Sequence, residues 1–273
     1  MKSIFVFGAG KVGRALAKGW KKARLAVTLR PARRGWPARV DADVIVLAVR
    51  DRDLPEAVRT LADRKLRARG TTVVHCAGAL GAEPLAPLRA LGVSVAQMHP
   101  MISFASTEFV PTLAGGNVHV QGDAIAVRRA RSLAKALGMT PRTFPKLDAI
   151  GYHAAAGLVA NGSAALAAIG RDVLVAAGVP KRDAPKLLGP LLRSVAENVE
   201  HLGFPHALTG PVRRGDRAAI ARARDLLATR VPEAVPIFLA TVRAQLPLAR
   251  EIGEAPKDAF DGIATWLEFV HRS

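Results

Sequence analysis

The 273-residue sequence has one cysteine and one tyrosine. Phe, Trp and Tyr together make up only 5% of the chain. Because Cys76 has no second cysteine to pair with, an internal disulfide framework and a metal site built from several cysteines are both excluded. Nothing in the pattern of potential ligands predicts a bound metal. The default expectation is a cytoplasmic protein without a metal centre.

Acidic residues are also scarce. The chain has 22 Asp and Glu against 40 Lys and Arg, which gives a formal charge of +18 and an isoelectric point near 11.3. Such a surplus can indicate nucleic acid, an acidic surface or an anionic substrate as partner. The sequence has no zinc-ligand spacing, no nucleic-acid motif and no basic patch interleaved with aromatic residues. We therefore do not expect nucleic acid as the main partner, and a basic surface composition explains much of the charge.

Long hydrophobic runs are missing too. The first apolar run follows a single Lys and ends in glycines, so we expect no signal peptide. The uncharged stretch Ala154–Ile169 is shorter than a span of roughly 20 residues and contains Asn161 and Ser163. We predict that it forms a buried, closely packed helix and does not cross a membrane.

A glycine-rich turn follows the first apolar run, Ile4–Phe7. The spacing Gly-x-Gly-x-x-Gly between a strand and a helix is typical of a dinucleotide-binding loop. In such a loop Gly8 permits the tight turn, Gly10 lets the backbone approach a pyrophosphate, and Gly13 lets helix and strand pack closely. The phosphates would lie at the N-terminus of a helix over residues 11–23. The cofactor-binding residues predicted from this motif are Gly8, Ala9, Gly10, Lys11, Val12 and Gly13.

The rest of the chain divides into two parts by its texture. Up to residue 146, apolar strand-like runs alternate with helix-like segments, which predicts an α/β fold with a doubly wound, mainly parallel sheet. The expected strands are 3–7, 25–29, 43–49, 71–75, 93–98, 117–121 and 140–144, and the expected helices are 11–23, 54–64, 82–91 and 123–137. From residue 147 the strands vanish and Ala-rich helical stretches are separated by prolines. We predict a dinucleotide-binding domain over 1–146 and an all-helical domain for substrate binding and dimerisation over 147–273.

The residues after the second strand favour NADP(H) over NAD(H). In NAD-binding versions of this fold an Asp or Glu at that place binds the ribose 2′-hydroxyl. Here Arg30 stands at that position, Arg33 and Arg34 follow, and no acidic residue precedes Asp41. A guanidinium suits a 2′-phosphate. A solvated basic turn is the alternative.

Ligands in open α/β sheets lie beyond the carboxyl ends of the strands, so the loops there are candidate sites. One loop offers Val49 and Arg50 beside the cofactor, and the next offers Cys76, Ala77 and Gly78. The third, His99–Phe104, is predicted to be a loop because of its proline and carries His99 and Ser103 as candidate catalytic residues. A loop imidazole bonded only to backbone remains the alternative for His99, and Cys76 can equally be a small packed residue.

The helical part opens with a polar stripe. His153, Gly157 and Asn161 follow each other at intervals of four and so lie on one helix face. His153 and Asn161 are candidate catalytic residues, and the gap at Gly157 would let a ligand approach. Satisfaction of the stripe by neighbouring helices alone is the alternative. Further on, Thr209 and Arg214 lie in a Gly/Pro loop and are candidates for holding an anionic substrate.

Taken together, these motifs resemble a family of largely uncharacterised bacterial proteins that join a Rossmann-like N-terminal domain to a helical C-terminal domain of unknown function. The segments that carry the resemblance are Gly8–Gly13, His75–Gly78, His99–Phe104, Tyr152–Asn161 and Thr209–Asp216. More distantly the chain is similar to the 6-phosphogluconate dehydrogenase-like superfamily, which includes pyrroline-5-carboxylate reductase, the β-hydroxyacid dehydrogenases and the deazaflavin-dependent NADP reductases.

The superfamily resemblance implies a homodimer formed through the helical domain and an active site between the two domains. It also exposes a departure. β-Hydroxyacid dehydrogenases pair a catalytic Lys with an Asn one helical turn later; Asn161 stands at the Asn position, but Gly157 stands at that of the Lys. His153 stands one turn further back, and because histidine can act as a general acid or base, we expect it to replace the lysine.

These features predict an NADP(H)-dependent oxidoreductase for a small, anionic carbonyl, imine or hydroxy substrate. His153 or His99 would transfer the proton, and Asn161 with Ser103 would orient the substrate. The alternative is a non-catalytic NADP-binding sensor or partner-binding protein that keeps the fold without the chemistry.

Overall fold

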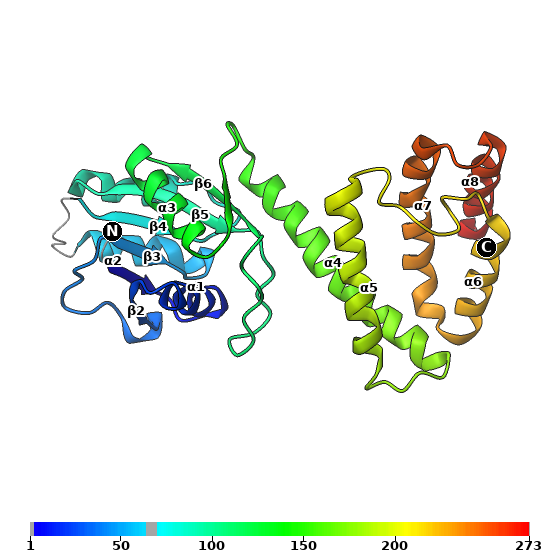
Figure 1. Cartoon of the computed structure of the whole chain (residues 1–273), viewed down its shortest axis with the longest axis horizontal. Coiled ribbons are helices and arrows are strands. Elements are labelled where there is room, and N and C mark those ends of the chain that lie inside the picture. Colours follow the sequence, from blue (N-terminus) through cyan, green and yellow to red (C-terminus); the bar gives the residue numbers. More distant parts are fainter. Residues whose placement is uncertain (1–2, 64–69, 273) are drawn as a thin grey trace. The chain divides into compact units, whose positions relative to one another are not determined.

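A computed structural model describes residues 3–63 and 70–272 of the chain (Figure 1). The chain divides into two compact units, Met1–Ala160 and Asn161–Ser273. The division falls inside one long helix, α4 (Ala149–Ala176).

The first unit is built on a seven-stranded sheet with the strand order β2-β1-β3-β4-β5-β6-β7. Neighbouring strands are parallel, except that β5 and β6 are antiparallel. The strands are β1 (Ser3–Phe7), β2 (Ala26–Arg30), β3 (Val44–Leu47), β4 (Thr72–His75), β5 (Ser94–Pro100), β6 (Asn117–Gly122) and β7 (Thr140–Arg142). The predicted fold class, a mainly parallel sheet followed by helices, is confirmed.

Helices cover both faces of this sheet. The α-helices are α1 (Lys11–Lys22), α2 (Leu54–Ala62) and α3 (Ala124–Ala136), and short 3₁₀ segments are η1 (Ala32–Arg34) and η2 (Asp51–Asp53). The segment predicted as a helix over 82–91 is a 3₁₀ helix, η3 (Glu83–Leu91). Proline at positions 84 and 87 explains the difference, because proline lacks the N–H that an α-helix needs in its interior.

Each face has its own apolar core. On one face α1 and α3 pack over the sheet, and the fully buried Trp20 donates its indole N–H to the carbonyl of Leu133 at 2.9 Å. On the other face α2 and η3 pack over Phe7, Leu47 and their neighbours. The central strands are therefore apolar on both sides, as expected for a parallel sheet covered by helices.

Strand β5 is longer than predicted and includes His99. The sequence predicts a strand that ends at residue 98 and a loop from His99, whereas the structure pairs His99 with His119 and Pro100 with Val118. The antiparallel partner β6 extends the strand beyond the end of β4, and Pro100 ends it. His99 is thus fixed by a sheet and not carried by a loop.

The second unit is helical. Besides the second half of α4 it contains α5 (Ala184–Leu202), α6 (Arg217–Arg230), the 3₁₀ segment η4 (Pro232–Ala234), α7 (Val235–Ile252) and α8 (Lys257–Arg272). Its main core lies between α6, α7 and α8 and includes Ile220, Leu246 and Phe260. The side chain of Asp216 caps α6 by accepting the amide hydrogen of Ala219 at 2.9 Å.

Helix α4 differs from its prediction. A buried helix was expected over Ala154–Ile169, but α4 has no buried residue. By length and composition alone α4 is also apolar enough to cross a membrane, which for one helix is weak evidence.

Candidate active site

The glycine loop has the geometry that its motif predicts. Gly8 has φ +116°, and a Cβ there would lie 2.6 Å from the carbonyl carbon of Ala48. A Cβ at Gly13 would overlap the carbonyl oxygen of Gly8. At Gly10, the N-cap of α1, an added Cβ would meet nothing within 4 Å. The loop therefore needs two of its glycines for packing and keeps open space at the third, where free N–H groups begin the helix.

A cavity of about 650 Å³ lies at the carboxyl ends of the strands in the first unit. It connects the glycine loop to the loops after β3 and β4 and to the end of β5. Its lining includes most of the predicted cofactor residues together with both predicted histidines: Gly10, Lys11, Val12, Val49, Arg50, Cys76, Ala77, Gly78, His99 and His153. Chemistry-bearing residues from distant parts of the sequence thus meet in one cavity.

His99 and His153 meet over Gly78. Their rings lie 5.6 Å apart between centroids and are nearly perpendicular, at 70°. A Cβ on Gly78 would lie 2.7 Å from Cε1 of each ring and would overlap Nδ1 of His153. The absence of a side chain at residue 78 is therefore what allows the two imidazoles to approach each other.

The tautomer of His99 is fixed by its hydrogen bond. Its Nδ1 lies 3.2 Å from the carbonyl oxygen of Cys76, which can only accept, so Nδ1 carries the proton. In the neutral ring Nε2 then has the free lone pair. Burial lowers the pKa of His99, and the nearby His153 lowers it further while Asp51 raises it. His99 is therefore neutral at pH 7.

Two aromatic residues that the sequence prediction left out complete this cluster. Tyr152 lies 6.1 Å from His99 and 5.6 Å from His119 between ring centroids. His119 is buried, stacks on Phe144 at 5.8 Å, and burial lowers its pKa. In the sequence, His119 could have been recognised because it and Gln121 alternate with apolar residues in a predicted strand. Its partner His99, however, is known only once β5 and β6 are paired.

The loop after β4 is held by side chains from below. Its thiol, Cys76, is partly buried against the core beside the cavity, and burial raises its pKa to about 12, which disfavours the reactive thiolate. This supports the alternative of a small packed residue. The polar side chains of His75 on β4 and Gln97 on β5 hydrogen-bond the backbone of the same loop at Ala77.

Ser103 is not brought to the cavity. The segment after β5 is irregular but extended, and Ile102 and Phe104 turn inward and line the cavity. Ser103 lies between them and is exposed. The same alternation that buries its neighbours directs it away.

Arg30 has partners of its own. Its Nε donates to the carbonyl of Gly35 at 2.5 Å and its Nη2 to the carbonyl of Arg34 at 2.9 Å. These bonds use two of the five N–H groups of a guanidinium and tie the end of β2 to the following turn. Arg33 is exposed on the same turn and makes no hydrogen bond among the described residues. The turn thus presents a basic surface at the end of β2.

The remaining candidates lie in the second unit. Asn161 is exposed on α4, four residues after Gly157. Thr209 and Arg214 are exposed in the loop before α6. The neighbouring Arg213, which the sequence analysis passed over, holds this loop by an ion pair with Glu254 and a 2.9 Å bond to the carbonyl of Leu208.

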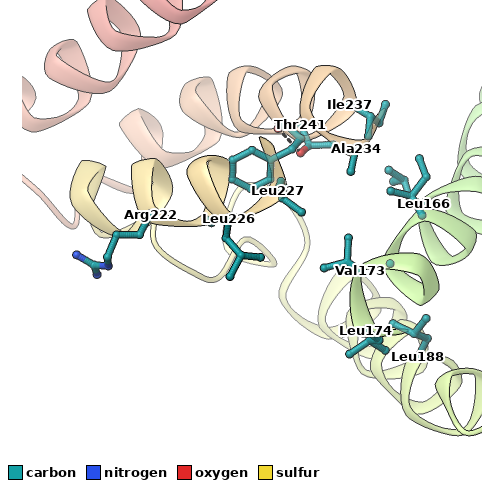
Figure 2. A pocket seen from close by; sticks show the side chains of 14 residues that line it. Leu166, Val173, Leu174, Leu188, Arg222, Leu226, Leu227, Ala234, Ile237 and Thr241 are labelled. Atoms are coloured by element: carbon teal, nitrogen blue, oxygen red, sulfur yellow. Dashed lines mark hydrogen bonds between the residues drawn. The ribbon is translucent and has the colours of Figure 1, made fainter. Parts of the chain in front are cut away.

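The second unit also has an apolar groove of about 710 Å³. Figure 2 shows Leu166 and Val173 of α4 facing side chains of α6 and α7, among them Leu227 and Ile237. Its lining offers almost no polar group, so it has the chemistry of a packing surface.

Sequence profiles match two stretches of the chain. A Rossmann-like domain matches residues 36–100, and a domain of unknown function, DUF2520, matches residues 117–244. No curated protein matches the chain in sequence.

Solved structures share the fold at low sequence identity. A protein of Bacteroides fragilis, BF3122, described provisionally as an NADP oxidoreductase, has a TM-score of 0.68 and 17% identity, with 89% of this chain and 97% of that chain covered. A pyrroline-5-carboxylate reductase of Coxiella burnetii has a TM-score of 0.54 and 18% identity, with coverage of 91% and 97%. An imine reductase of Myxococcus stipitatus in complex with NADP⁺ has a TM-score of 0.55 and 19% identity, with coverage of 91% and 93%.

Proposed function

The chain joins a Rossmann-like domain to a domain of the DUF2520 family, and from this premise we propose that it is an NADP(H)-dependent oxidoreductase. Its substrate is a small, anionic carbonyl, imine or hydroxy compound. The observation that carries the proposal is the 650 Å³ cavity, which combines the open N-terminus of α1 at Gly10 with His99 and His153. Proteins of the same fold that bind NADP⁺ or reduce pyrroline-5-carboxylate and imines support it.

The residues around the cavity fit a nicotinamide dinucleotide. The N–H groups of Lys11, Val12 and Gly13 would hold the pyrophosphate, and Gly10 leaves it room. Arg33 and the N–H groups that remain free on Arg30 would bind a 2′-phosphate, which is the basis for preferring NADP(H). When bound, the cofactor supplies or accepts the hydride.

The protein's own part in the reaction is to move a proton. In the direction of reduction, we assign proton donation to His153, because the partly buried His99 is neutral at pH 7 and has its Nδ1–H engaged with Cys76. His99 holds the His153 ring by its edge contact over Gly78. In the reverse direction His153 accepts the proton. Asn161 orients the substrate, and Arg214 with Thr209 holds its anionic group.

Binding and turnover test this proposal. We expect NADPH to bind more tightly than NADH and to be oxidised by at least one member of a panel of anionic carbonyl and imine compounds. His153→Ala and Asn161→Ala should lose turnover while His201→Ala, an exposed histidine of α5, keeps it. Turnover that survives in both of the first two variants would show that the residue assignment is wrong.

One observation favours a second function. Gly157 stands where related dehydrogenases have a catalytic lysine, which suits a sensor that binds NADP(H) without using it. A sensor would bind NADPH tightly, oxidise it with no compound of the panel, and capture a partner only in the presence of the nucleotide.

We also propose that the helical unit pairs with a second copy of itself. Helix α5 carries an exposed apolar stripe that includes Leu187, Leu191, Val195 and Leu202, with Leu191 58% exposed. From Leu187 to Leu202 the stripe is about 23 Å long at 1.5 Å per residue. Together with the apolar groove in the same unit (Figure 2), it gives this unit an extended apolar surface that the same surface of a second copy would cover in a two-fold interface. Monomers rarely leave such surfaces in water.

The molecular mass of the protein in solution tests whether two copies pair. Sedimentation should give a dimer at micromolar concentration, Leu191→Glu should shift it to monomer, and Arg193→Glu on the opposite side of α5 should not. A monomeric wild-type protein would refute the pairing.

A further inference from the structure

Two buried polar side chains lie directly beneath the loop that borders the cavity. His75 at the end of β4 and Gln97 on β5 face each other in register across the sheet, and both are almost completely buried. Neither lines the cavity. Buried polar side chains in an apolar sheet are costly unless they are paired, so their partners indicate what they are for.

All of their hydrogen bonds go to the backbone of the loop after β4. The amide of Ala77 donates to Nδ1 of His75 at 3.1 Å, and Nε2 of His75 lies 2.6 Å from the carbonyl oxygen of Gly81. The side-chain NH₂ of Gln97 donates to the carbonyl of Ala77 at 2.8 Å. Both polar groups of Ala77 are thus held from beneath, and His99 holds the carbonyl of Cys76.

These contacts require one state of His75. Because Nδ1 accepts a hydrogen bond, it must carry the lone pair, and the proton must lie on Nε2, which donates to Gly81. A protonated ring would place an N–H against the N–H of Ala77. Gln97 is held through its NH₂, which donates to Ala77, while its side-chain oxygen is buried and has no hydrogen-bond partner among the described residues.

The held segment leads directly into Gly78, the residue over which His99 and His153 meet. A shift of the backbone at Ala77 moves Gly78 and with it the space shared by the two rings. The contacts therefore connect a buried pair that lies outside the cavity lining to the part of the cavity where the chemistry is proposed.

We propose that His75 and Gln97 are positioning residues that fix the Cys76–Gly78 backbone and thereby set the cofactor cavity and the His99–His153 pair for the reaction. This inference rests on the function proposed above. It also makes the site sensitive to acid, because protonation of His75 breaks its bond to Ala77.

The surroundings of His75 determine the pH at which its ring becomes protonated. Burial lowers its pKa below the usual 6.5, its bond to Gly81 raises it, the carboxylates of Asp51 on η2 and Glu83 on η3 also raise it, and His99 on β5 lowers it. The neutral ring is therefore maintained at pH 7 and is lost only on acidification below pH 6.5.

Substitutions at position 75 test the proposal. His75→Leu removes both bonds at similar volume, whereas His75→Asn keeps an oxygen that can accept from Ala77. Thr72→Val is the matched control, because Thr72 is buried on the same strand but bonds Ser94 and Arg129, away from the loop. Gln97→Leu tests the second partner.

Amide hydrogen exchange of residues 76–81 and NADPH affinity are the readouts. We expect His75→Leu and Gln97→Leu to accelerate exchange in this loop and to raise the Kd for NADPH about tenfold, the effect of losing one buried hydrogen bond. His75→Asn should restore most of the NADPH affinity. In wild type, protonation of His75 should weaken this affinity as the pH falls below 6.5, and His75→Asn should lack that part of the pH dependence. Thr72→Val should change neither readout.

The outcomes separate the inference from the proposed function. Unchanged exchange and affinity in both leucine variants would overturn the positioning role. If wild type does not bind NADPH at all, the proposed function fails, and so does the role of the pair in it, whatever the exchange rates show. If wild type binds and His75→Asn binds as weakly as His75→Leu, the bond to Ala77 is not what matters and the inference is overturned.

Discussion

Replacing Gly78 by alanine is the sharpest test of the paired imidazoles. The backbone at Gly78 does not lie in the left-handed region, so alanine fits its conformation, and any effect comes from the added methyl group alone. That methyl group would lie 2.7 Å from Cε1 of His99 and of His153, where ordinary contacts are 3.4–4 Å. It therefore acts on the two candidate rings and on little else.

The size of the effect follows from which ring can yield. His99 is bonded to Cys76 and paired in a sheet, so it cannot retreat, whereas His153 is exposed on the first turns of α4. His153 must move by about 1 Å or rotate away, and a misplacement of this size can lower the rate about 100-fold. Stability should change little, because the moving ring is at the surface and alanine restricts the unfolded chain.

Steady-state turnover with NADPH and thermal unfolding measure the two effects separately. We expect kcat to fall about 100-fold in Gly78→Ala, while the Kd for NADPH rises only slightly and Tm stays within a few degrees of wild type. Gly262→Ala is the matched control, because a Cβ there meets nothing within 4 Å. A Gly78→Ala enzyme with unchanged kcat would refute the claim that His153 must stand over residue 78 to transfer the proton.

Three further predictions follow from the first unit. Gly13→Ala should leave little soluble folded protein, as judged by circular dichroism, because its Cβ overlaps the rigid carbonyl of Gly8 and costs more than the 1–3 kcal/mol of ordinary overpacking. Cys76 should react with a thiol reagent much more slowly in the native protein than after denaturation, since burial raises its pKa to about 12; equally fast labelling of the native protein would contradict this. The free energy of unfolding should decrease as the pH falls below 6.5: burial lowers the pKa values of His75, His99 and His119, so the unfolded chain binds more protons there. Denaturant titrations from pH 7 to pH 5 measure it, and a flat profile would contradict it.

The parts of the site that the sequence predicts are those in which the backbone imposes the residue type. Gly13 is required by its close contact with the carbonyl of Gly8 five positions earlier, and Gly8 by its positive φ in the turn and its contact with Ala48 after β3. Together they leave a fixed spacing in the sequence. Local constraints of this kind can be recognised without the structure.

The parts that it misses depend on pairing between distant strands. His99 was placed in a loop because proline follows it, yet its partner His119 extends the strand, and nothing local to either residue announces this. The burial of α4 was overestimated for a related reason. An uncharged helix predicts that something covers it but not that the cover lies within the same chain.

The antiparallel register makes the missed residues understandable as a set. In β5 the polar residues Gln97 and His99 are two positions apart, and in β6 the same spacing separates His119 from Gln121. Because Gln97 pairs with Gln121 and His99 with His119, all four side chains lie on one face of the sheet. His75 on β4 joins the same face through its pairing with Gln97. In a sheet that is covered on both faces, such a row of buried polar side chains is costly unless the side chains are paired. Three of the five, His75, Gln97 and His99, hydrogen-bond the segment Cys76–Gly78 at the carboxyl edge of the sheet. The polar row is therefore better explained as the support of the cavity than as part of the core, and alternating polar residues in two strands expected to be buried are the sequence signal by which such a support can be sought.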